Sequence, residues 1–226
     1  MEQKTVLKPP LSGEVVIPSS IDGQVVTEIG ENFAKGNKKI TKVTIPSTVT
    51  KIDFSAFEDC TSLEKVVYLS QTSSETGEIV RDLTYGVDVF RGDTALKEAI
   101  VPARALNAAS GTFAGCTSIT SANIDGISQI GSEMFKDCTA LKSVTLGSNV
   151  AKINDAAFAY SNLDSITLAS RSLPYSVGNH SFDGVKSGFK IYIPDDCKNT
   201  WTDLSFVSSK GWPQSMIDMM EVKTAA

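Results

Sequence analysis

The sequence is poor in the features that mark several classes of protein. Its 226 residues include a single histidine, His180, and no uninterrupted run of 18 apolar residues that could form a membrane helix. Lys and Arg number 21 against 26 Asp and Glu, and the positive charges form no basic stripe, so a nucleic acid is not an expected partner. The first ten residues lack an apolar segment, so we do not expect a signal peptide in this chain.

Catalytic and metal-binding motifs are absent as well. The sequence contains no GxxxxGK[ST], GxGxxG, HExxH or GxSxG motif. The cysteines at 60, 116 and 138 are 56 and 22 residues apart, which does not fit a zinc site, and one histidine makes a Cys–His pair improbable. The adjacent Asp195 and Asp196 are poorly placed to converge on one substrate. We therefore expect no enzyme activity, cofactor or metal, and we expect His180 to lie on the surface or in a bend.

Phenylalanine recurs at nearly constant spacing along the chain. The intervals are 24, 33, 23, 22, 23 and 24 residues, between phenylalanines 33, 57, 90, 113, 135, 158 and 182. Six or seven residues after most of them comes a pattern such as Leu141-x-x-Val144-x-Leu146, which predicts a strand with one buried face. A unit of about 23 residues cannot bury its own apolar side chains. Stacked units would bury Phe on Phe and Leu on Leu, so the repeat predicts a solenoid.

A second apolar pair, such as Val150 and Ile153, precedes each phenylalanine and is followed by a small or polar residue. Four residues before the phenylalanine stand Asp53, Gly86, Gly131, Asn154 and Gly178, with Ala109 as the exception. Gly, Asn and Asp tolerate positive φ better than other residues. We therefore expect a tight bend with positive φ at this position of each unit.

The interruptions of the repeat predict the boundaries of the parts. The 33-residue interval holds about ten extra residues, which we place in a protruding loop or small hairpin at 70–80. Residues 1–32 form an N-terminal cap and atypical first turn, in which Asp22-Gly23 is a hairpin signal. The solenoid is assigned to 33–194. Residues 195–226 contain both tryptophans and form the C-terminal cap, with two short helices expected.

The stretch "ITKVTIPSTVTKIDFSAFEDCTSLEKV" (40–66) resembles the BspA-like leucine-rich repeat, also found in Treponema surface proteins. The similarity covers about residues 13–194. It implies a leucine-rich repeat solenoid, which would be a right-handed, β-rich arc of the α/β horseshoe type with about seven repeats. It also implies a non-enzymatic role at the bacterial cell surface or outside the cell, in adhesion to host proteins or in co-aggregation.

Three cysteines occupy equivalent places three residues after a phenylalanine. Their matched contexts favour small buried side chains that line the interior. A disulfide between Cys116 and Cys138, in adjacent units, remains an alternative. Asp93 takes the same place in another unit, and because a buried carboxylate is costly we expect the chain to deviate toward the surface there. Cys197 lies in the cap and is expected to be exposed.

The residues between the buried strand positions should face outward and form two columns across the sheet. From these columns we select as candidate partner-binding residues Lys65, Val67, Glu98, Ile100, Asn123, Thr145, Thr167 and Tyr192. Val67 and Ile100 are the unexpected apolar pair, and they form a contact patch unless residues 70–80 cover them.

Two functions follow as expectations. In the first, the chain binds a host extracellular-matrix protein, another surface protein or a glycan through the concave strand face. In the second, the array is a structural spacer or an oligomerisation module of a larger protein, with contacts through Trp201, Trp212 and Met216–Met220.

Overall fold

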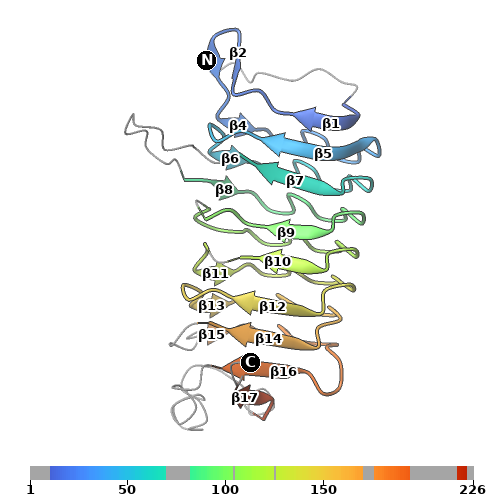
Figure 1. The fold of residues 1–226 in the computed structure, drawn as a ribbon, viewed down its shortest axis with the longest axis vertical. Helices are drawn as coiled ribbons and strands as arrows, with labels where there is room; N and C mark the ends of the chain where they lie inside the picture. The colour runs from blue at the N-terminus through green and yellow to red at the C-terminus, as the bar shows by residue number, and fades with distance from the viewer. Residues whose placement is uncertain are drawn as a thin grey trace.

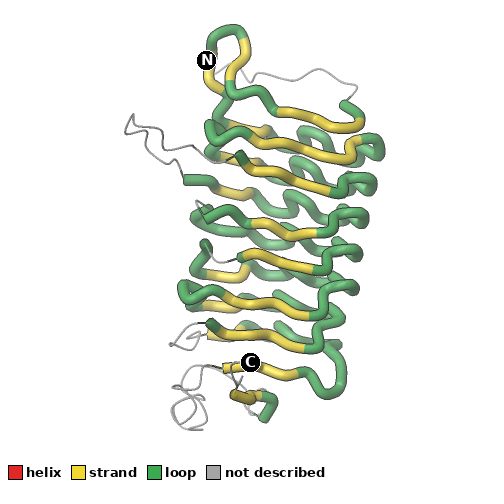
Figure 2. The backbone as a smooth tube through the Cα atoms, viewed as in Figure 1, coloured by secondary structure: helices red, strands yellow, loops and turns green. Residues whose placement is uncertain are grey.

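The computed structural model describes residues 11–69, 82–103, 105–124, 126–169, 176–193 and 218–222. These residues form an elongated stack of turns (Figures 1 and 2). The predicted solenoid is therefore confirmed. Figure 2 shows strands and loops without a helix over this part of the chain, so the α/β character implied by the resemblance is not seen in it. No helix long and apolar enough to cross a membrane occurs within the described ranges.

Two series of strands run along the stack, one on each of two sides. The long strands are β1 (Gly13–Val16), β5 (Ile40–Ile45), β7 (Lys65–Tyr68), β9 (Glu98–Ile100), β10 (Ser121–Asn123), β12 (Ser143–Leu146), β14 (Ser165–Leu168), β16 (Lys190–Ile193) and β17 (Met220–Val222). The short strands are β4 (Glu28–Ile29), β6 (Lys51–Ile52), β8 (Thr84–Tyr85), β11 (Gln129–Ile130), β13 (Lys152–Ile153) and β15 (Ser176–Val177). The turns that carry the phenylalanines occupy the third side.

The long strands pair in parallel, but not as one uninterrupted sheet. Their hydrogen-bonded orders are β1-β5-β7, β9-β10 and β12-β14-β16-β17. The ladder is therefore interrupted between β7 and β9, where the 33-residue unit lies, and again between β10 and β12 (Figure 1). The short strands pair in parallel as β4-β6-β8 and β11-β13-β15.

The phenylalanines form one stacked column, as the spacing predicts. From Phe57 to Phe182, neighbouring ring centroids lie 5.5 to 5.7 Å apart with interplanar angles of 4° to 14°. The 33-residue unit keeps this geometry, because Phe57 and Phe90 are 5.5 Å apart. Phe33 ends the column edge-on to Phe57 at 71°. Since the rings from Phe57 to Phe158 are at most 1% exposed, the column is the centre of the core.

The expected site of positive φ is wrong. Asp53, Gly86, Gly131, Asn154 and Gly178 all lack positive φ. Positive φ occurs instead at two other positions of most units. Two residues before the phenylalanine, it is found at Ser55, Asp88, Gly111, Glu133, Ala156 and His180. Two residues after the phenylalanine, it is found at Asp59, Gly92, Gly115, Asp137, Tyr160 and Gly184.

The glycines four residues before phenylalanine have a different physical reason. A Cβ on Gly131 would lie 2.6 Å from the carbonyl oxygen of Ala108, and a Cβ on Gly178 would lie 2.4 Å from the backbone nitrogen of Asp155. Real Cβ atoms essentially never approach other atoms this closely. Glycine is needed there because consecutive turns nearly touch, and not because of backbone dihedrals.

The two ends of the stack differ. At the N-terminal end, β2 (Ser20–Ile21) and β3 (Gln24–Val25) form the predicted antiparallel hairpin, with Asp22 at φ 50° and Gly23 at φ 79°. Positive φ at both turn residues is the geometry that suits a two-residue hairpin. At the other end, β17 extends the parallel ladder from β16. The expected loop at 70–80, Cys197 and the expected helices of the C-terminal cap fall outside the described residues.

Candidate binding surface

The outward side of strands β5, β7, β9, β10, β12, β14 and β16 is called the long-strand face below. Its side chains alternate as a strand with one buried face requires. On β12, Ser143 and Thr145 are exposed while Val144 and Leu146 are buried. Strand β14 repeats the alternation, with half-buried Ser165 and Thr167 in the outward positions.

The strand register shows which candidate residues lie side by side. They are distributed as Lys65 and Val67 on β7, Glu98 and Ile100 on β9, Asn123 on β10, Thr145 on β12, Thr167 on β14 and Tyr192 on β16. Thr145 pairs with Thr167, which pairs with Tyr192. Ile100 pairs with Asn123. The ladders thus bring these residues together in three groups, on β7, on β9 and β10, and on β12, β14 and β16, separated by the two interruptions.

Val67 and Ile100 are not brought together by a ladder. Val67 pairs with Thr44 on β5, and β7 and β9 form no ladder with each other. Both side chains are half-buried, so they are less accessible than the expectation of an exposed apolar pair requires. The segment 70–80, which was expected to decide whether they are covered, lies outside the described residues.

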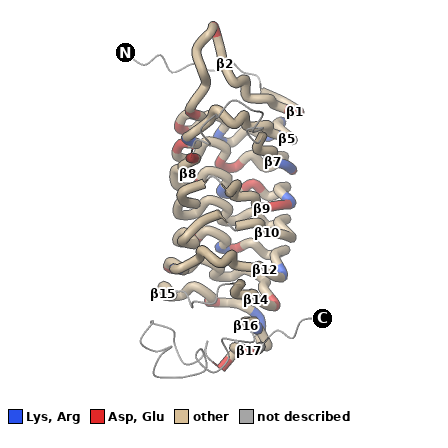
Figure 3. Tube along the Cα trace, turned by 60° about the vertical axis from the view of Figure 1, so that its left-hand side comes forward, with Lys and Arg blue, Asp and Glu red and all other residues tan. Residues whose placement is uncertain are grey.

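Charge is unevenly distributed over the strand side of the molecule (Figure 3). Near the N-terminal end, Lys42 and Glu14 lie 3.0 Å apart and Lys97 and Glu64 lie 2.6 Å apart. Near the C-terminal end, Lys190 pairs with Glu221. Between these pairs, the outward residues of β10, β12 and β14 are Ser121, Asn123, Ser143, Thr145, Ser165 and Thr167. This set, the uncharged strip, carries no formal charge itself, while the exposed Lys142 and Asp164 directly precede β12 and β14 at its edge.

The three cysteines are buried free thiols, as the sequence predicts. Each thiol donates a hydrogen bond to a carbonyl oxygen of the preceding turn. Cys116 donates to Phe90 at 3.0 Å, Cys138 to Phe113 at 3.2 Å and Cys60 to Ala34 at 3.1 Å. Loss of solvation by burial raises the pKa of Cys60 and of Cys138 to about 12. These thiols contribute to packing and not to nucleophilic chemistry.

Asp93 is also inside, and the expected deviation toward the surface is wrong. Its side chain is 0% exposed. Oδ1 accepts a hydrogen bond from the backbone N–H of Cys60 at 2.8 Å, while Oδ2 is buried without a partner. Burial raises the pKa of Asp93 well above its usual value, and the negative charges of Asp59 and Glu58 act in the same direction. The carboxyl thus occupies the interior position that a buried thiol fills at Cys60, Cys116 and Cys138.

The described residues contain no group of His, Cys, Asp and Glu side chains that could hold a metal ion. His180 is exposed and lies in a bend, at φ 58°, as expected. Its Nδ1 lies 2.7 Å from Oδ2 of Asp183.

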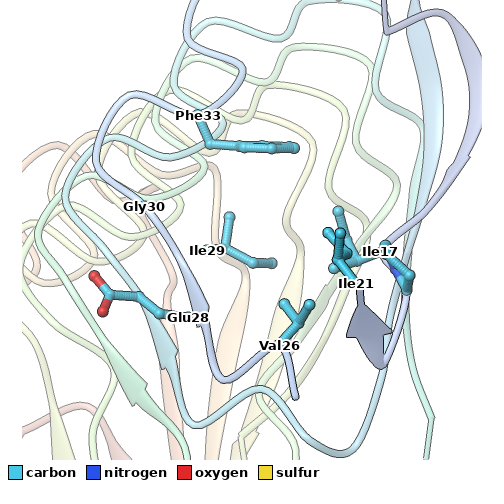
Figure 4. Close-up of a pocket in the computed structure, with 8 residues that line it drawn as sticks. Ile17, Ile21, Val26, Glu28, Ile29, Gly30 and Phe33 are labelled. Atoms are coloured by element: carbon cyan, nitrogen blue, oxygen red, sulfur yellow. The ribbon is translucent and has the colours of Figure 1, made fainter. Parts of the chain in front are cut away.

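A small pocket lies between the hairpin and the first turn of the solenoid (Figure 4). Sequence reasoning missed this pocket, because it depends on how the cap packs on the first turn. It is lined by Ile17, Pro18, Ile21, Val26, Glu28, Ile29, Gly30 and Phe33. Glu28 points away from the apolar side chains in Figure 4, and it lies 3.4 Å from Lys51. The pocket therefore offers apolar walls and no convergent polar groups for catalysis.

Comparison with known proteins agrees with this geometry. The family model for the BspA type leucine rich repeat region matches six copies over residues 14–80 and 83–188. The search of curated proteins found no match.

Two crystal structures share the fold. A leucine rich cell surface protein from Faecalibacterium prausnitzii A2-165 is 24% identical with a TM-score of 0.66, over 79% of this chain and 47% of that one. A leucine-rich repeat protein from Bacteroides ovatus ATCC 8483 is 26% identical with a TM-score of 0.54, over 86% of this chain and 56% of that one. The chain thus spans about half the length of these two proteins. Because the family model covers most of the sequence, this chain belongs to the BspA-type leucine-rich repeat family.

Proposed function

We propose that this chain is a non-enzymatic binding module of a bacterial surface or secreted protein, which takes up a protein or a glycan on the long-strand face. The observation that carries the proposal is the uncharged strip, a regular array of hydroxyl and amide side chains on parallel strands. Leucine-rich repeats generally serve as scaffolds for protein interaction, and one neighbour in fold is described as a cell surface protein. An extracellular or cell-surface location agrees with both points.

The mechanism of binding is adsorption through many modest contacts. Neighbouring strands lie about 4.8 Å apart, so Thr145 and Thr167 offer two hydroxyl groups at one strand spacing. Tyr192 follows on the next strand and adds an aromatic surface. Because its own side chains carry no charge, and the adjoining Lys142 and Asp164 are opposite in sign, the strip fits a neutral, hydrogen-bonding partner better than a strongly acidic or basic one.

The test is a binding screen of the intact chain against extracellular-matrix proteins and a glycan array. The partner found is then measured against the double variant Asn123→Lys with Thr145→Lys, since both side chains are exposed on the face. We expect affinity to fall by at least about tenfold, because the variant buries two new charges in the contact. The matched control is Thr117→Lys with Thr139→Lys, two exposed threonines on the turn side. Equal binding by the two variants would place the contact elsewhere.

The apolar pair is tested separately. We expect Val67→Asp combined with Ile100→Asp to reduce binding if the contact extends over β7 and β9. Since both residues are half-buried, the melting temperature must be measured on the same samples. Lost binding at an unchanged melting temperature supports a contact role, whereas a large fall in melting temperature shows that the pair is part of the core.

A structural role is the second candidate. It is favoured by the observation that the chain spans about half the length of its two structural neighbours. In that role the solenoid is a spacer or an oligomerisation module, with contacts through the C-terminal segment. Trp201 and Trp212 lie outside the described residues, while Met219 and Met220 pack against the core. A negative screen together with a mass that rises with concentration in sedimentation would favour this role.

A further inference from the structure

In the units that carry Cys116 and Cys138, the residue three after the phenylalanine has a double hydrogen-bonding task. Its side chain receives a backbone N–H from the preceding turn, as Cys116 does from Asp93 and Cys138 does from Cys116. The same side chain donates to a carbonyl of the preceding turn, Cys116 to Phe90 and Cys138 to Phe113. A thiol can do both because it is at once a weak donor and a weak acceptor.

Asp93 occupies the same position, and its side chain also accepts a backbone hydrogen bond. Its Oδ1 receives the N–H of Cys60 at 2.8 Å, which matches the acceptor contacts of the cysteines. The donor half is different, because an ionised carboxylate has no proton to give. Oδ2 is the oxygen that is left, and it is buried without a partner. By analogy with Cys116 and Cys138, the acceptor that corresponds to Asp93 is the carbonyl oxygen of Phe57, which also accepts the N–H of Cys60 at 3.1 Å.

The surroundings of Asp93 do not compensate a negative charge. The preceding turn presents Glu58, Asp59 and Cys60, and the following turn presents Cys116. None of the lysines and arginines in the described ranges forms an ion pair with Asp93.

The two cations that act on Glu58 are both engaged in ion pairs that do not include Asp93. Lys35 lies 2.8 Å from Glu58 itself. Arg91 lies 3.2 Å from Asp88 and 3.5 Å from Glu133. An ionised Asp93 would therefore be a buried charge surrounded by groups that are negative or neutral, which is the costly case.

Asp93 also lies at the junction where the long-strand ladder is missing. Strands β7 and β9 are unpaired with each other. The two units are held by the Phe57–Phe90 stack, by the β6–β8 ladder and by bonds such as Lys97 N–H to the Glu64 carbonyl at 3.3 Å. A change at Asp93 thus acts on a junction that lacks the long-strand ladder and keeps turn-side bonds such as Phe57 N–H to the Val89 carbonyl at 2.9 Å and Asp59 N–H to the Arg91 carbonyl at 2.7 Å.

We propose that Asp93 holds a proton at neutral pH, donates it through Oδ2 to the carbonyl of Phe57, and so makes the junction between these two units a pH-sensitive contact that loosens when the proton is lost. This inference is independent of what the long-strand face binds. Only a proton moves, from the carboxyl to solvent, and no other reactant is needed. The same position in the next two units holds a thiol, so the proton sensitivity is confined to one junction.

The direction of the pH effect follows from the raised pKa of Asp93 in the folded chain. The unfolded carboxyl titrates near pH 4. Between that pH and the folded pKa, the folded state binds more protons than the unfolded state, so stability from this residue is lost as pH rises. The stability that Asp93 contributes is fully present below the pKa of the unfolded carboxyl and is lost above the pKa of the folded one.

Infrared spectroscopy of the intact protein tests the proton directly. We expect a protonated-carboxyl C=O band at pH 7 that disappears in Asp93→Asn and persists in Asp164→Asn, whose exposed side chain pairs with Lys186.

The amide of Asp93→Asn can accept and donate like the neutral acid. We therefore expect its melting temperature to exceed that of the wild type increasingly as pH rises from 5 to 9. Absence of the band at neutral pH, or parallel pH profiles, would overturn the proposal.

Hydrogen exchange keeps the test decisive if Asp93→Asn does not fold. In the wild-type protein, the amide of Cys60 bonds to Asp93 Oδ1 and the amide of Leu96 bonds to the Asp93 carbonyl at 3.0 Å. After correction for intrinsic exchange rates, protection at these two amides should fall with alkaline pH more than at Cys138 and Leu141 in a thiol-bearing unit. Equal losses in both units would contradict a localised proton effect.

Discussion

Gly86 lies directly against the backbone of Phe54, one turn earlier: a Cβ on Gly86 would be 2.5 Å from the Phe54 nitrogen. The contact is with backbone, so no side-chain rotation can relieve it. We expect Gly86→Ala to lower the free energy of unfolding by about 1–3 kcal/mol, as overpacking does. Urea unfolding followed by circular dichroism measures the change.

Gly30 provides the control for Gly86, because it also lacks positive φ and has nothing within 4 Å of its hypothetical Cβ. Gly30→Ala should therefore leave stability unchanged or slightly raised, since alanine restricts the unfolded chain. Equal losses in the two variants would mean that the close approach of consecutive turns is not the reason for glycine at position 86.

The stacked column makes a second prediction, on the depth of the core. Phe113 lies between Phe90 at 5.6 Å and Phe135 at 5.7 Å and is 1% exposed. We expect Phe113→Ala to cost about 3–5 kcal/mol, because it opens a cavity between two rings whose turns are held by inter-turn bonds such as Phe113 N–H to the Met134 carbonyl at 3.1 Å. Phe54→Ala is the control, since that ring is 42% exposed and should cost about 1 kcal/mol or less. Similar costs would show that the column can collapse around a gap.

The column was predictable from the sequence because stacking needs only the residue spacing. A large apolar residue every 22 to 24 residues must meet its counterpart in the next turn, whatever the details of the bend. The same logic correctly placed Cys60, Cys116 and Cys138 inside. The longer 33-residue interval does not interrupt the column, since the rings of Phe57 and Phe90 remain stacked.

The bend conformation was not predictable from residue type. Glu133, Ala156 and Tyr160 adopt positive φ although side chains disfavour it. Each is held by a bond to the next turn, such as Glu133 N–H to the Asp155 carbonyl at 3.0 Å and Tyr160 N–H to the Asp183 carbonyl at 2.6 Å. These inter-turn bonds outweigh the local preference, and a single unit read by itself contains no sign of them.

The candidate surface was predictable in its alternation but not in its continuity. Strand periodicity identified Thr145, Thr167 and Tyr192 as outward neighbours, and the register places them so. The same alignment put Val67 beside Ile100, where the ladder is absent. Residue counts fix which positions correspond between turns, but hydrogen bonding also requires the right distance and angle between strands, which the counts do not specify.

A third prediction concerns acid sensitivity at Asp53. Its Oδ2 lies 2.7 Å from Lys51 Nζ, and its Oδ1 accepts the N–H of Phe54 at 2.8 Å. The hydrogen bond from Lys51 is the largest cause that lowers the pKa of Asp53 below its usual value. Its contribution is therefore present above the unfolded pKa near 4 and is lost as pH falls through the folded pKa.

We expect Asp53→Asn to lower the free energy of unfolding by about 0.5–1 kcal/mol at pH 7, with the difference shrinking toward pH 2. Denaturant titrations of both proteins across this range measure it. Asp164→Asn removes a more exposed carboxylate whose partner is Lys186, and should change stability less. A difference between Asp53→Asn and wild type that grows toward low pH would show the wrong sign and refute the assignment.

The last prediction tests whether the buried cysteines resist alkylation in the folded protein. Burial raises the pKa of Cys60 and of Cys138 to about 12, against about 8.5 for a free thiol, so the thiolate fraction near neutral pH falls by roughly three orders of magnitude. In a Cys197→Ser background, iodoacetamide at pH 8 should leave Cys60, Cys116 and Cys138 unmodified in the folded chain and modify all three in denaturant. Mass spectrometry counts the adducts. Rapid modification of Cys138 in the folded protein would show that the turns open readily. Formation of a disulfide between Cys116 and Cys138 under an oxidant would instead favour the alternative pairing that their positions in adjacent units allow.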